Sequence, residues 1–428
     1  MKVLILGSGA KDSAIAWWFS KSRKIENLFI APGNPGTSAF ATNLPDIDLQ
    51  DKEQILNACK KYDINYVFIG TETPLVAGIP DFLIKNGLSV FGTPSYALKF
   101  EDDKKFSREF AKKYNIPMPD YHVFDNLSEL EVFLDTNKNK FFVLKPNNIS
   151  PSKIIVISDN KATLLEATKK HLKSSSVIVE DFIKGISITL TLLLDKKGYL
   201  ILPICSEYTK KEHGKEDIIT GGMGAVCPVP LDDKIKQKIR NEIIKPTLKG
   251  MQENNLFYKG VLTFSIILKD DQPYLVDYHV RLNDPATESF VPLINNDLVD
   301  IVNAIEENKL SSIKLDTTND STVAVVLAAE GYPTNTKTKC KVKLAHPKYN
   351  TSHITGFPYI FYGAINTINN KDNKIVNTGG RIATVVGIST NIIKANYNAY
   401  SAIGSVELEG GIWYREDIGN KFFISMAE

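Results

Sequence analysis

Three residues of complementary chemistry alternate along one stretch of the chain, namely Asp277, His279 and Arg281. Alternate residues of a β-strand project from the same face, so the carboxylate, the imidazole and the guanidinium would stand in a row. Such a row suits a site for Mg²⁺ and a polyphosphate, because the acid can hold the metal and the arginine can neutralise phosphate oxygens. A solvent-facing ion pair is the alternative interpretation.

Two glycine-rich segments could approach an anion through their backbone N–H groups. One is Thr220-Gly221-Gly222-Met223-Gly224, and the other is Gly7-Ser8-Gly9-Ala10, which follows an apolar run. The second segment argues against a nicotinamide cofactor, because Asp12 stands where the dinucleotide pattern has a glycine and the next strand ends in Ala31-Pro32-Gly33 instead of an acid. An ordinary loop and a tight turn remain the alternatives.

Two lysines are candidates for contacts with phosphate. Lys104 stands near the start of a charged helical stretch, and Lys145 ends the apolar run 141–144. A lysine at the end of such a run is poorly explained as part of a core, so a phosphate contact is plausible. A solvated strand end is the alternative for each lysine taken alone.

The composition excludes several classes of protein. The 428 residues include 51 basic and 49 acidic side chains, and a net charge of +2 is too small for a protein that binds nucleic acid. No apolar run approaches the roughly 18 residues that a membrane span needs. The cysteines form no CxxC pair, and no small-residue cleavage site follows the opening apolar run. We therefore expect a soluble, multidomain, cytoplasmic protein.

The elements that must position these residues begin with an alternation of strands and helices. The first three expected elements are a strand over Val3–Gly7, a helix over Asp12–Ser20 and a strand over Leu28–Ala31. Further strands are expected at Tyr66–Gly70 and Ser89–Gly92. This alternation predicts a parallel sheet covered by helices on both faces. Ligands of such sheets bind beyond the carboxyl ends of the strands.

The rest of the chain has a different pattern of expected helices and strands. A connecting helix is expected over Phe100–Tyr114, followed by short strands and one helix up to Glu180. Longer antiparallel strands are expected on either side of a helix over Ile235–Gly250, and strands again dominate beyond Ser321. The predicted class is therefore α/β plus α+β.

Taken in order, these pieces resemble the phosphoribosylamine–glycine ligases (glycinamide ribonucleotide synthetases), which are ATP-grasp enzymes of purine synthesis. The resemblance runs along the whole chain. Its most specific stretches are Ala31–Thr37, Thr220–Gly224, Arg281–Pro285, Gly379–Arg381 and Tyr414–Gly419.

The resemblance implies a particular domain order. It consists of an N-terminal pre-ATP-grasp domain (1–100), a linker helix (101–120), an ATP-grasp lid (121–190), an ATP-grasp core (191–325) and a β-rich C-terminal domain (326–428). It also implies that ATP, with Mg²⁺ (or Mn²⁺), activates glycine as an acyl phosphate that 5-phosphoribosylamine attacks. The expected partners are these small molecules only, with no nucleic acid or membrane, and the expected state is a monomer or weak homodimer.

The resemblance also suggests roles for individual residues. Asp277 and His279 fall at the metal ligands, Arg281 at a phosphate-contacting arginine with a catalytic role, and Asp284 at a catalytic position in the glycine-binding neighbourhood. The expected nucleotide contacts are Lys104, Lys145, Lys153, Glu180 and Lys210. The expected substrate contacts are Gly9, Asn34, Glu72, Thr220, Gly221 and Gly222.

The chain departs from the family mainly around the nucleotide. The family's glycine-rich lid loop is replaced at 145–154 by a segment without glycine and with two prolines. His279 stands in place of an asparagine, although Mg²⁺ prefers oxygen ligands, and Ala286 stands in place of a glutamate. Three hypotheses follow: a working ligase of this family, a ligase for a different acid or amine, and a catalytically impaired binding homologue.

Overall fold

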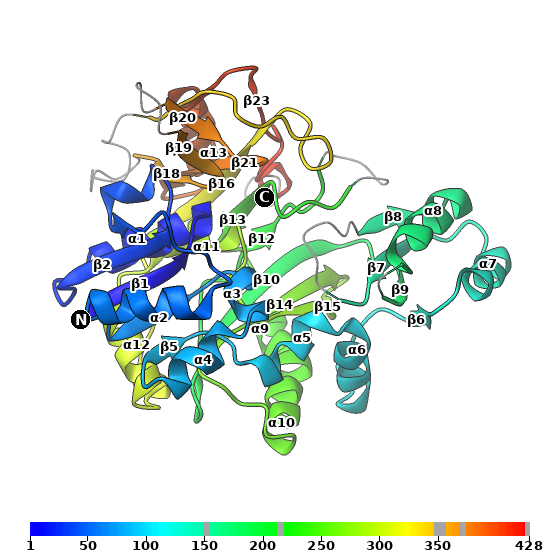
Figure 1. Cartoon of the computed structure of the whole chain (residues 1–428). Coiled ribbons are helices and arrows are strands. Elements are labelled where there is room, and N and C mark those ends of the chain that lie inside the picture. Colours follow the sequence, from blue (N-terminus) through cyan, green and yellow to red (C-terminus); the bar gives the residue numbers. More distant parts are fainter. Residues whose placement is uncertain (149–154, 174, 212–217, 346–356, 369–373, 424–428) are drawn as a thin grey trace.

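The computed structural model describes residues 1–148, 155–173, 175–211, 218–345, 357–368 and 374–423. Figure 1 follows the chain from an N-terminal sheet through a projecting small subdomain and a central sheet to a C-terminal sheet.

The N-terminal sheet is parallel, as the alternation of elements predicted. Its strands are β1 (Lys2–Gly7), β2 (Asn27–Pro32), β3 (Thr42–Asn43), β4 (Tyr66–Ile69) and β5 (Ser89–Phe91), in the order β3-β2-β1-β4-β5. Because β1 is apolar at successive positions, it can be buried on both faces. Leu4 and Leu6 pack with α2 (Lys52–Lys61) and α4 (Ile79–Lys85), and Val3 and Ile5 pack with α1 (Ala10–Ser20).

The connection to the next region is two helices, whereas the sequence predicted one over Phe100–Tyr114. Helix α5 (Lys99–Asp102) ends at Asp103, whose backbone is extended with φ −131° and ψ 93°. The Asp103 carboxylate then accepts a hydrogen bond from the N–H of Phe106 at 3.0 Å and caps α6 (Lys104–Lys113). Lys104 thus becomes the first residue of a new helix.

The small subdomain projects from the body of the molecule, as Figure 1 shows. Its antiparallel strands have the order β6-β9-β7-β8 and are β6 (Tyr121–Phe124), β7 (Phe142–Pro146), β8 (Val156–Ser158) and β9 (Val177–Asp181). Helices α7 (Leu127–Thr136) and α8 (Lys161–His171) lie together, and Leu130 and Leu164 pack into a core with Phe142 and Leu144.

The central sheet is antiparallel and positions the predicted row of side chains. Its order is β11-β10-β14-β15, built from β10 (Ile186–Leu194), β11 (Tyr199–Ile201), β14 (Gly260–Lys269) and β15 (Gln272–His279). In β15, Asp277 lies opposite Ser265 and His279 opposite Thr263, while Tyr278 between them points into the core. A continuous helical stretch covers this core. It consists of α9 (Asp233–Ile239), a π-helix over Arg240–Ile244 and α10 (Lys245–Glu253).

The C-terminal sheet includes strands from earlier in the chain. Its order is β12-β13-β16-β21-β18, with β23 (Ile412–Trp413) also paired with β16. The members are β12 (Ser206–Glu207), β13 (Gly224–Cys227), β16 (Ser321–Ala329), β18 (Tyr359–Tyr362) and β21 (Arg381–Ser389). Strand β16 therefore crosses the predicted domain boundary at 325, and the glycine-rich segment leads directly into β13. The domain limits remain a prediction.

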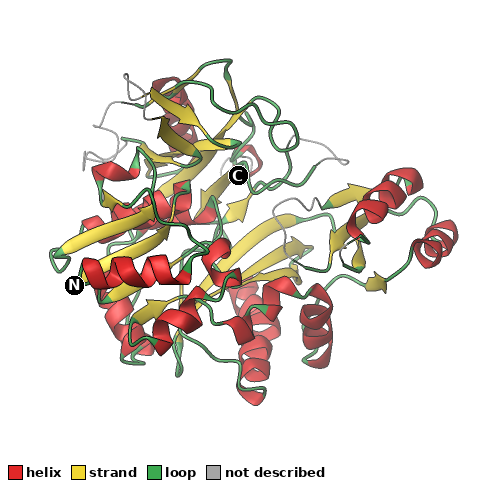
Figure 2. Ribbon diagram, in the orientation of Figure 1, coloured by secondary structure: helices red, strands yellow, loops and turns green. Residues whose placement is uncertain are grey.

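The remaining elements cover these sheets. Helix α13 (Ile392–Ala402) packs on β21 and β16, and α3 (Glu72–Val76), α11 (Ala286–Phe290) and α12 (Leu298–Glu306) lie nearer the N-terminal part. Two short pairs, β17 (Val342–Lys343) with β22 (Glu407–Leu408) and β19 (Ile365–Ile368) with β20 (Lys374–Asn377), complete the C-terminal part. Figure 2 shows the helices and strands of all regions. The predicted α/β plus α+β class is confirmed. None of the described helices could cross a membrane.

Candidate active site

Two buried lysines hold the carboxylate of Asp277. Nζ of Lys104 lies 2.8 Å from Asp277 Oδ1, and Nζ of Lys145 in β7 lies 3.1 Å from Oδ2. Burial alone would raise the pKa of Asp277, but Lys104, Lys145 and Arg108 outweigh burial and hold that pKa well below its usual value. The structure thus brings together three of the predicted site residues from the linker helix, the small subdomain and the central sheet.

A second buried carboxylate extends this cluster. Oε1 of Glu180 accepts a hydrogen bond from Nε of Arg108 at 2.6 Å, and Oε2 lies 2.9 Å from Nζ of Lys145. The charges therefore alternate along a buried row of five residues that links α6, β9, β7 and β15: Arg108, Glu180, Lys145, Asp277 and Lys104. Both oxygens of Glu180 are engaged within the protein, so its predicted contact with the nucleotide stays a prediction.

Arg281 forms ion pairs that link the end of the central strand β15 to helices α3 and α5. Its Nη2 lies 3.1 Å from Oε1 of Glu101 and 3.2 Å from Oε2 of Glu72, the first residue of α3. Glu101 also lies 3.1 Å from Nδ1 of His279 and accepts the N–H of Val280 at 2.9 Å. Burial would raise the pKa of Glu101, but Arg281 and His279 bring it down to about 2. A single carboxylate thus fixes the end of β15.

The glycine-rich segment is held against Asp284. Nη1 of Arg381 donates to Asp284 Oδ1 at 2.6 Å and to the carbonyl of Gly221 at 2.8 Å. Gly222 has φ +111°, and a Cβ there would lie 2.5 Å from Pro285 Cδ. Only glycine suits such a close approach in a left-handed conformation. Arg381 was part of a predicted family motif without an assigned role, and the structure places it between two predicted substrate segments.

The turn after β1 is held from two sides. The N–H of Gly9 donates to Asp12 Oδ2 at 2.9 Å, which closes the first turn of α1. Nδ2 of Asn34 donates to the carbonyls of Ser8 at 2.9 Å and Tyr362 at 3.0 Å. Gly9 and Asn34, both predicted substrate contacts, therefore share one loop cluster that the C-terminal sheet supports.

The other predicted residues lie as follows. Thr220 accepts the N–H of Gly222 at 3.0 Å through its hydroxyl and donates that hydroxyl to the carbonyl of Thr209 at 2.9 Å. The ammonium of Lys210 lies 5.7 Å from the centre of the Phe182 ring. Lys153 and most of the predicted lid loop lie outside the described residues.

Comparisons with known proteins cover nearly the whole chain. Family models match for the phosphoribosylglycinamide synthetase N domain at residues 1–101, the ATP-grasp (A) domain at 102–287 and the C domain at 322–421. The phosphoribosylamine–glycine ligase of Neisseria meningitidis serogroup B is 31% identical over 98% of this chain and 99% of its own. That of Clostridium acetobutylicum is 30% identical over 98% and 99%. The chain belongs to the phosphoribosylamine–glycine ligase family.

A solved structure of the family agrees with this assignment. The phosphoribosylamine–glycine ligase of Thermotoga maritima superimposes with a TM-score of 0.78 at 28% identity, over 98% of this chain and 100% of that one. A biotin carboxylase of Campylobacter jejuni, at 13% identity and a TM-score of 0.67, shares the fold over 99% of this chain and 94% of its own. The central part of the chain therefore has the ATP-grasp fold that its sequence predicted.

The residues predicted as metal ligands do not by themselves fit a magnesium site. Both carboxylate oxygens of Asp277 face ammonium groups, and the imidazole of His279 lies between Glu101 and Ser265, whose Oγ is 3.0 Å from Nε2. Within the described ranges, no group of three or more histidine, cysteine or acidic side chains could hold a metal ion. Mg²⁺ prefers oxygen ligands, so Asp277 alone of this pair has suitable chemistry.

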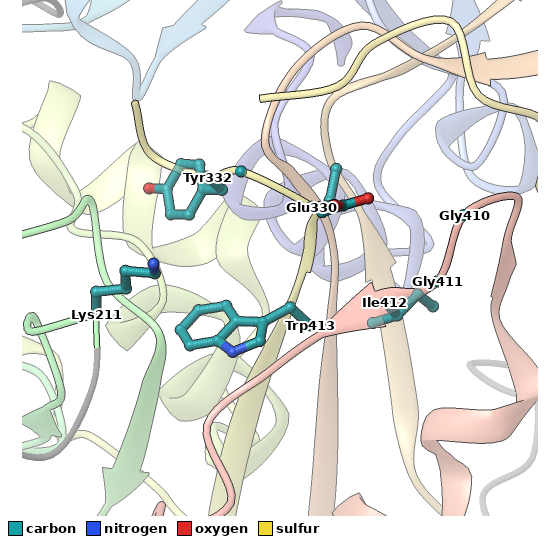
Figure 3. A pocket seen from close by; sticks show the side chains of 9 residues that line it. Lys211, Glu330, Tyr332, Gly410, Gly411, Ile412 and Trp413 are labelled. Carbon is teal, nitrogen blue, oxygen red and sulfur yellow. The ribbon is translucent and has the colours of Figure 1, made fainter. Parts of the chain in front are cut away.

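A cavity of about 210 Å³ opens beside the glycine-rich segment, and Figure 3 shows it from close by. Trp413 and Tyr332 form aromatic walls, with Lys211 near the Trp413 ring. The hydroxyl of Tyr332 accepts the N–H of Gly221 at 3.2 Å. The cavity wall therefore also supports the loop that faces Asp284.

Two charged residues of the site, Arg108 and Glu101, were not predicted from the sequence. Arg108 follows Lys104 by four residues and so lies on the same face of α6, which was the only signal available for it. Glu101 stood unremarked in the charged linker. Each acts through residues that are more than 70 positions away, namely Glu180 and the 279–281 segment.

Proposed function

We propose that the protein joins glycine to 5-phosphoribosylamine at the expense of ATP, as a C–N ligase of de novo purine biosynthesis. The observation that carries this proposal is the meeting of two buried lysines, Lys104 and Lys145, between the small and central sheets of an ATP-grasp fold in this family. Lysine clusters at such a junction suit the phosphates of a nucleotide.

The first step would activate the acid. A carboxylate oxygen of glycine attacks the γ-phosphorus of ATP, the bond to the bridging oxygen breaks, and ADP leaves. Lys104 and Lys145 would turn from Asp277 to the phosphate oxygens and neutralise the charge that develops there. Arg281 lies two residues beyond the end of β15, the strand that carries Asp277, and would add a third positive group.

The second step would form the amide. The amine of 5-phosphoribosylamine attacks the carbonyl carbon of the glycyl phosphate, and inorganic phosphate leaves with the oxygen that came from glycine. A carboxylate alone is inert toward amines, which is why the phosphate is needed as a leaving group. The protein's contribution is to position the reactants and to keep water from the acyl phosphate.

The ligand subsites follow from this scheme. Phosphoribosylamine would lie against Gly9, Asn34 and Glu72, and glycine would lie near Asp284. The remaining proposed contacts are Thr220, Gly221 and Gly222 for the substrates, and Lys153, Glu180 and Lys210 for the nucleotide. We expect ATP to be used with Mg²⁺ (or Mn²⁺), and the protein to be a cytoplasmic monomer or weak homodimer.

The test is an assay of ADP formation with ATP, phosphoribosylamine and a panel of amino acids. The proposal predicts turnover that requires both glycine and phosphoribosylamine. Turnover with another acid or amine only would favour the alternative ligase. If calorimetry shows that the protein does not bind ATP at millimolar concentration, the catalytically impaired binding homologue is favoured.

A further inference from the structure

Glu288 is a buried acid that the proposed mechanism does not use. It lies in α11, and its side chain is 0% exposed. Oε1 lies 3.2 Å from the hydroxyl of Thr384, whereas Oε2 has no hydrogen-bond partner among the described residues. An unpaired carboxylate oxygen inside a protein is costly, so its retention calls for an explanation.

The surroundings of Glu288 place it beside the proposed glycine subsite. Asp284 lies one turn earlier in the chain, and Asp284, Arg381 and Lys11 are its charged neighbours. Helix α11 packs against α1 of the N-terminal part and against β13, β16 and β21 of the C-terminal sheet, so it lies where these two parts meet. Arg381 in turn pairs with Asp284 at 2.6 Å and is near Glu207, another buried acid.

The unsatisfied groups at this junction are mainly acceptors. Besides Glu288 Oε2, Oδ1 of Asp12 and Oδ1 of Asn283 have no hydrogen-bond partner within the described ranges. Asp12 and Asn283 are 3% and 8% exposed, so bulk water does not satisfy them freely. Nε of Arg281 is an unpaired donor among the described residues, but the three acceptors outnumber it, so a ligand that reaches this junction would need donors, and a cation suits the carboxylates better than an anion.

We propose that Glu288 binds the ammonium group of the amino-acid substrate. This inference rests on the proposed ligase function and extends it to the residue that distinguishes an amino acid from other carboxylic acids. The ammonium of glycine is positively charged at neutral pH and carries three donors, whereas the amine on the sugar is a weaker base. Glu288 would hold this group while the glycine carboxylate reacts.

The proposal implies a change of protonation on binding. Burial first, and then Asp284, raise the pKa of Glu288 well above its usual value, while Arg381 and Lys11 oppose the shift. An ammonium group in contact would favour the carboxylate form, so glycine binding should release a proton. This release is a signature that a purely structural Glu288 would not give.

The experiment compares wild type with Glu288→Gln, which keeps the size and removes the charge. Asp195→Asn is the matched control, because Asp195 is a buried acid that accepts backbone N–H groups of Gly198 and Leu310 elsewhere in the fold. The glycine and ATP KM values are measured by ADP formation. Calorimetry with glycine and with glycolate, which has a hydroxyl in place of the ammonium, is run in two buffers of different ionisation enthalpy.

The expected result is a rise of about tenfold or more in the glycine KM of Glu288→Gln, with little change in the ATP KM. The variant should also lose the proton release and the preference for glycine over glycolate, and Asp195→Asn should keep both. An unchanged glycine KM or unchanged proton release in Glu288→Gln would overturn the inference while leaving the ligase function intact. A wild type that consumes ATP with no amino acid would refute both.

Discussion

Nε of Arg108 lies 2.6 Å from Oε1 of Glu180, and both side chains are at most 1% exposed. This pair is the inner end of the buried row that reaches Asp277 through Lys145. Because Glu180 shares its other oxygen with Lys145, Arg108 can fix the position of a proposed phosphate-binding lysine that it does not contact.

Replacing Arg108 by methionine should destabilise the fold. The change leaves Glu180 buried with one countercharge, and breaking a buried ion pair costs about 3–5 kcal/mol. Urea denaturation measures the loss. Lys170→Met is the control, since Lys170 pairs with Glu166 on the exposed face of α8, and it should change the stability little. Equal effects of both substitutions would show that burial of the Arg108 pair does not matter.

Replacing Asp277 by asparagine should separate binding from turnover. The two lysines lose their shared countercharge, so they should attract ATP at least as strongly as before. ADP formation should fall by about 100-fold or more, because Asp277 is the one member of the Asp277–His279 pair with oxygen ligands for Mg²⁺ and an amide is a weaker ligand than a carboxylate. Calorimetry with ATP and steady-state assays measure the two effects. Turnover near the wild-type rate would remove Asp277 from the site.

Replacing His279 by asparagine should retain or raise activity and lower the Mg²⁺ concentration needed for half-maximal rate. The reason is that an amide oxygen beside Asp277 is a better ligand for Mg²⁺ than an imidazole. Glu101 would still be held by Arg281 and by the N–H of Val280. A collapse of activity with an unchanged melting temperature would mean that the imidazole has a role of its own.

The stability of the protein should fall steeply in acid. The folded-state pKa of Glu101 is lowered from 4.5 to about 2, so its contribution is present above the unfolded value and is lost as the pH falls through the folded one. The shift corresponds to about 3 kcal/mol. Glu101→Gln should flatten the dependence of unfolding free energy on pH between about 4.5 and 2. An unchanged slope would show that the pair with Arg281 does not stabilise the fold.

Replacing Gly222 by alanine should impair catalysis. An added Cβ would lie 2.5 Å from Pro285 Cδ and 2.7 Å from the carbonyl oxygen of Asp284, at a positive φ. We expect ADP formation to fall by about tenfold or more, because a displacement of about 1 Å can cost 10²-fold in rate. Gly404→Ala, where no atom lies within 4 Å of the added Cβ, is the control and should behave like wild type.

The sequence predicted local order better than long-range partners. The alternation along β15 correctly placed Asp277 and His279 on one face, because that arrangement follows from strand geometry alone. It could not reveal that Glu101, 178 positions away, contacts His279, or that Arg381 reaches Asp284 across 97 positions. Such pairs depend on how the sheets pack against one another, which local patterns do not encode.

Buried polar groups were the hardest to foresee. Glu288 lies in a short helix whose sequence Ala286–Phe290 gives no sign that its acid is buried with an unpaired oxygen. The break of the linker helix at Asp103 was likewise missed, although aspartate is a common helix cap. Lys145, in contrast, was predicted as a candidate because a charge at the end of an apolar strand is unusual.

The central claim is that ATP activates the carboxylate of glycine, and an isotope experiment tests it most directly. Glycine labelled with ¹⁸O in its carboxylate is incubated with the protein, ATP and phosphoribosylamine, and the released phosphate is examined by mass spectrometry. The proposed function predicts one labelled oxygen in each phosphate, formed only when phosphoribosylamine is present. Unlabelled phosphate, or no phosphate beyond the level without glycine, would contradict it.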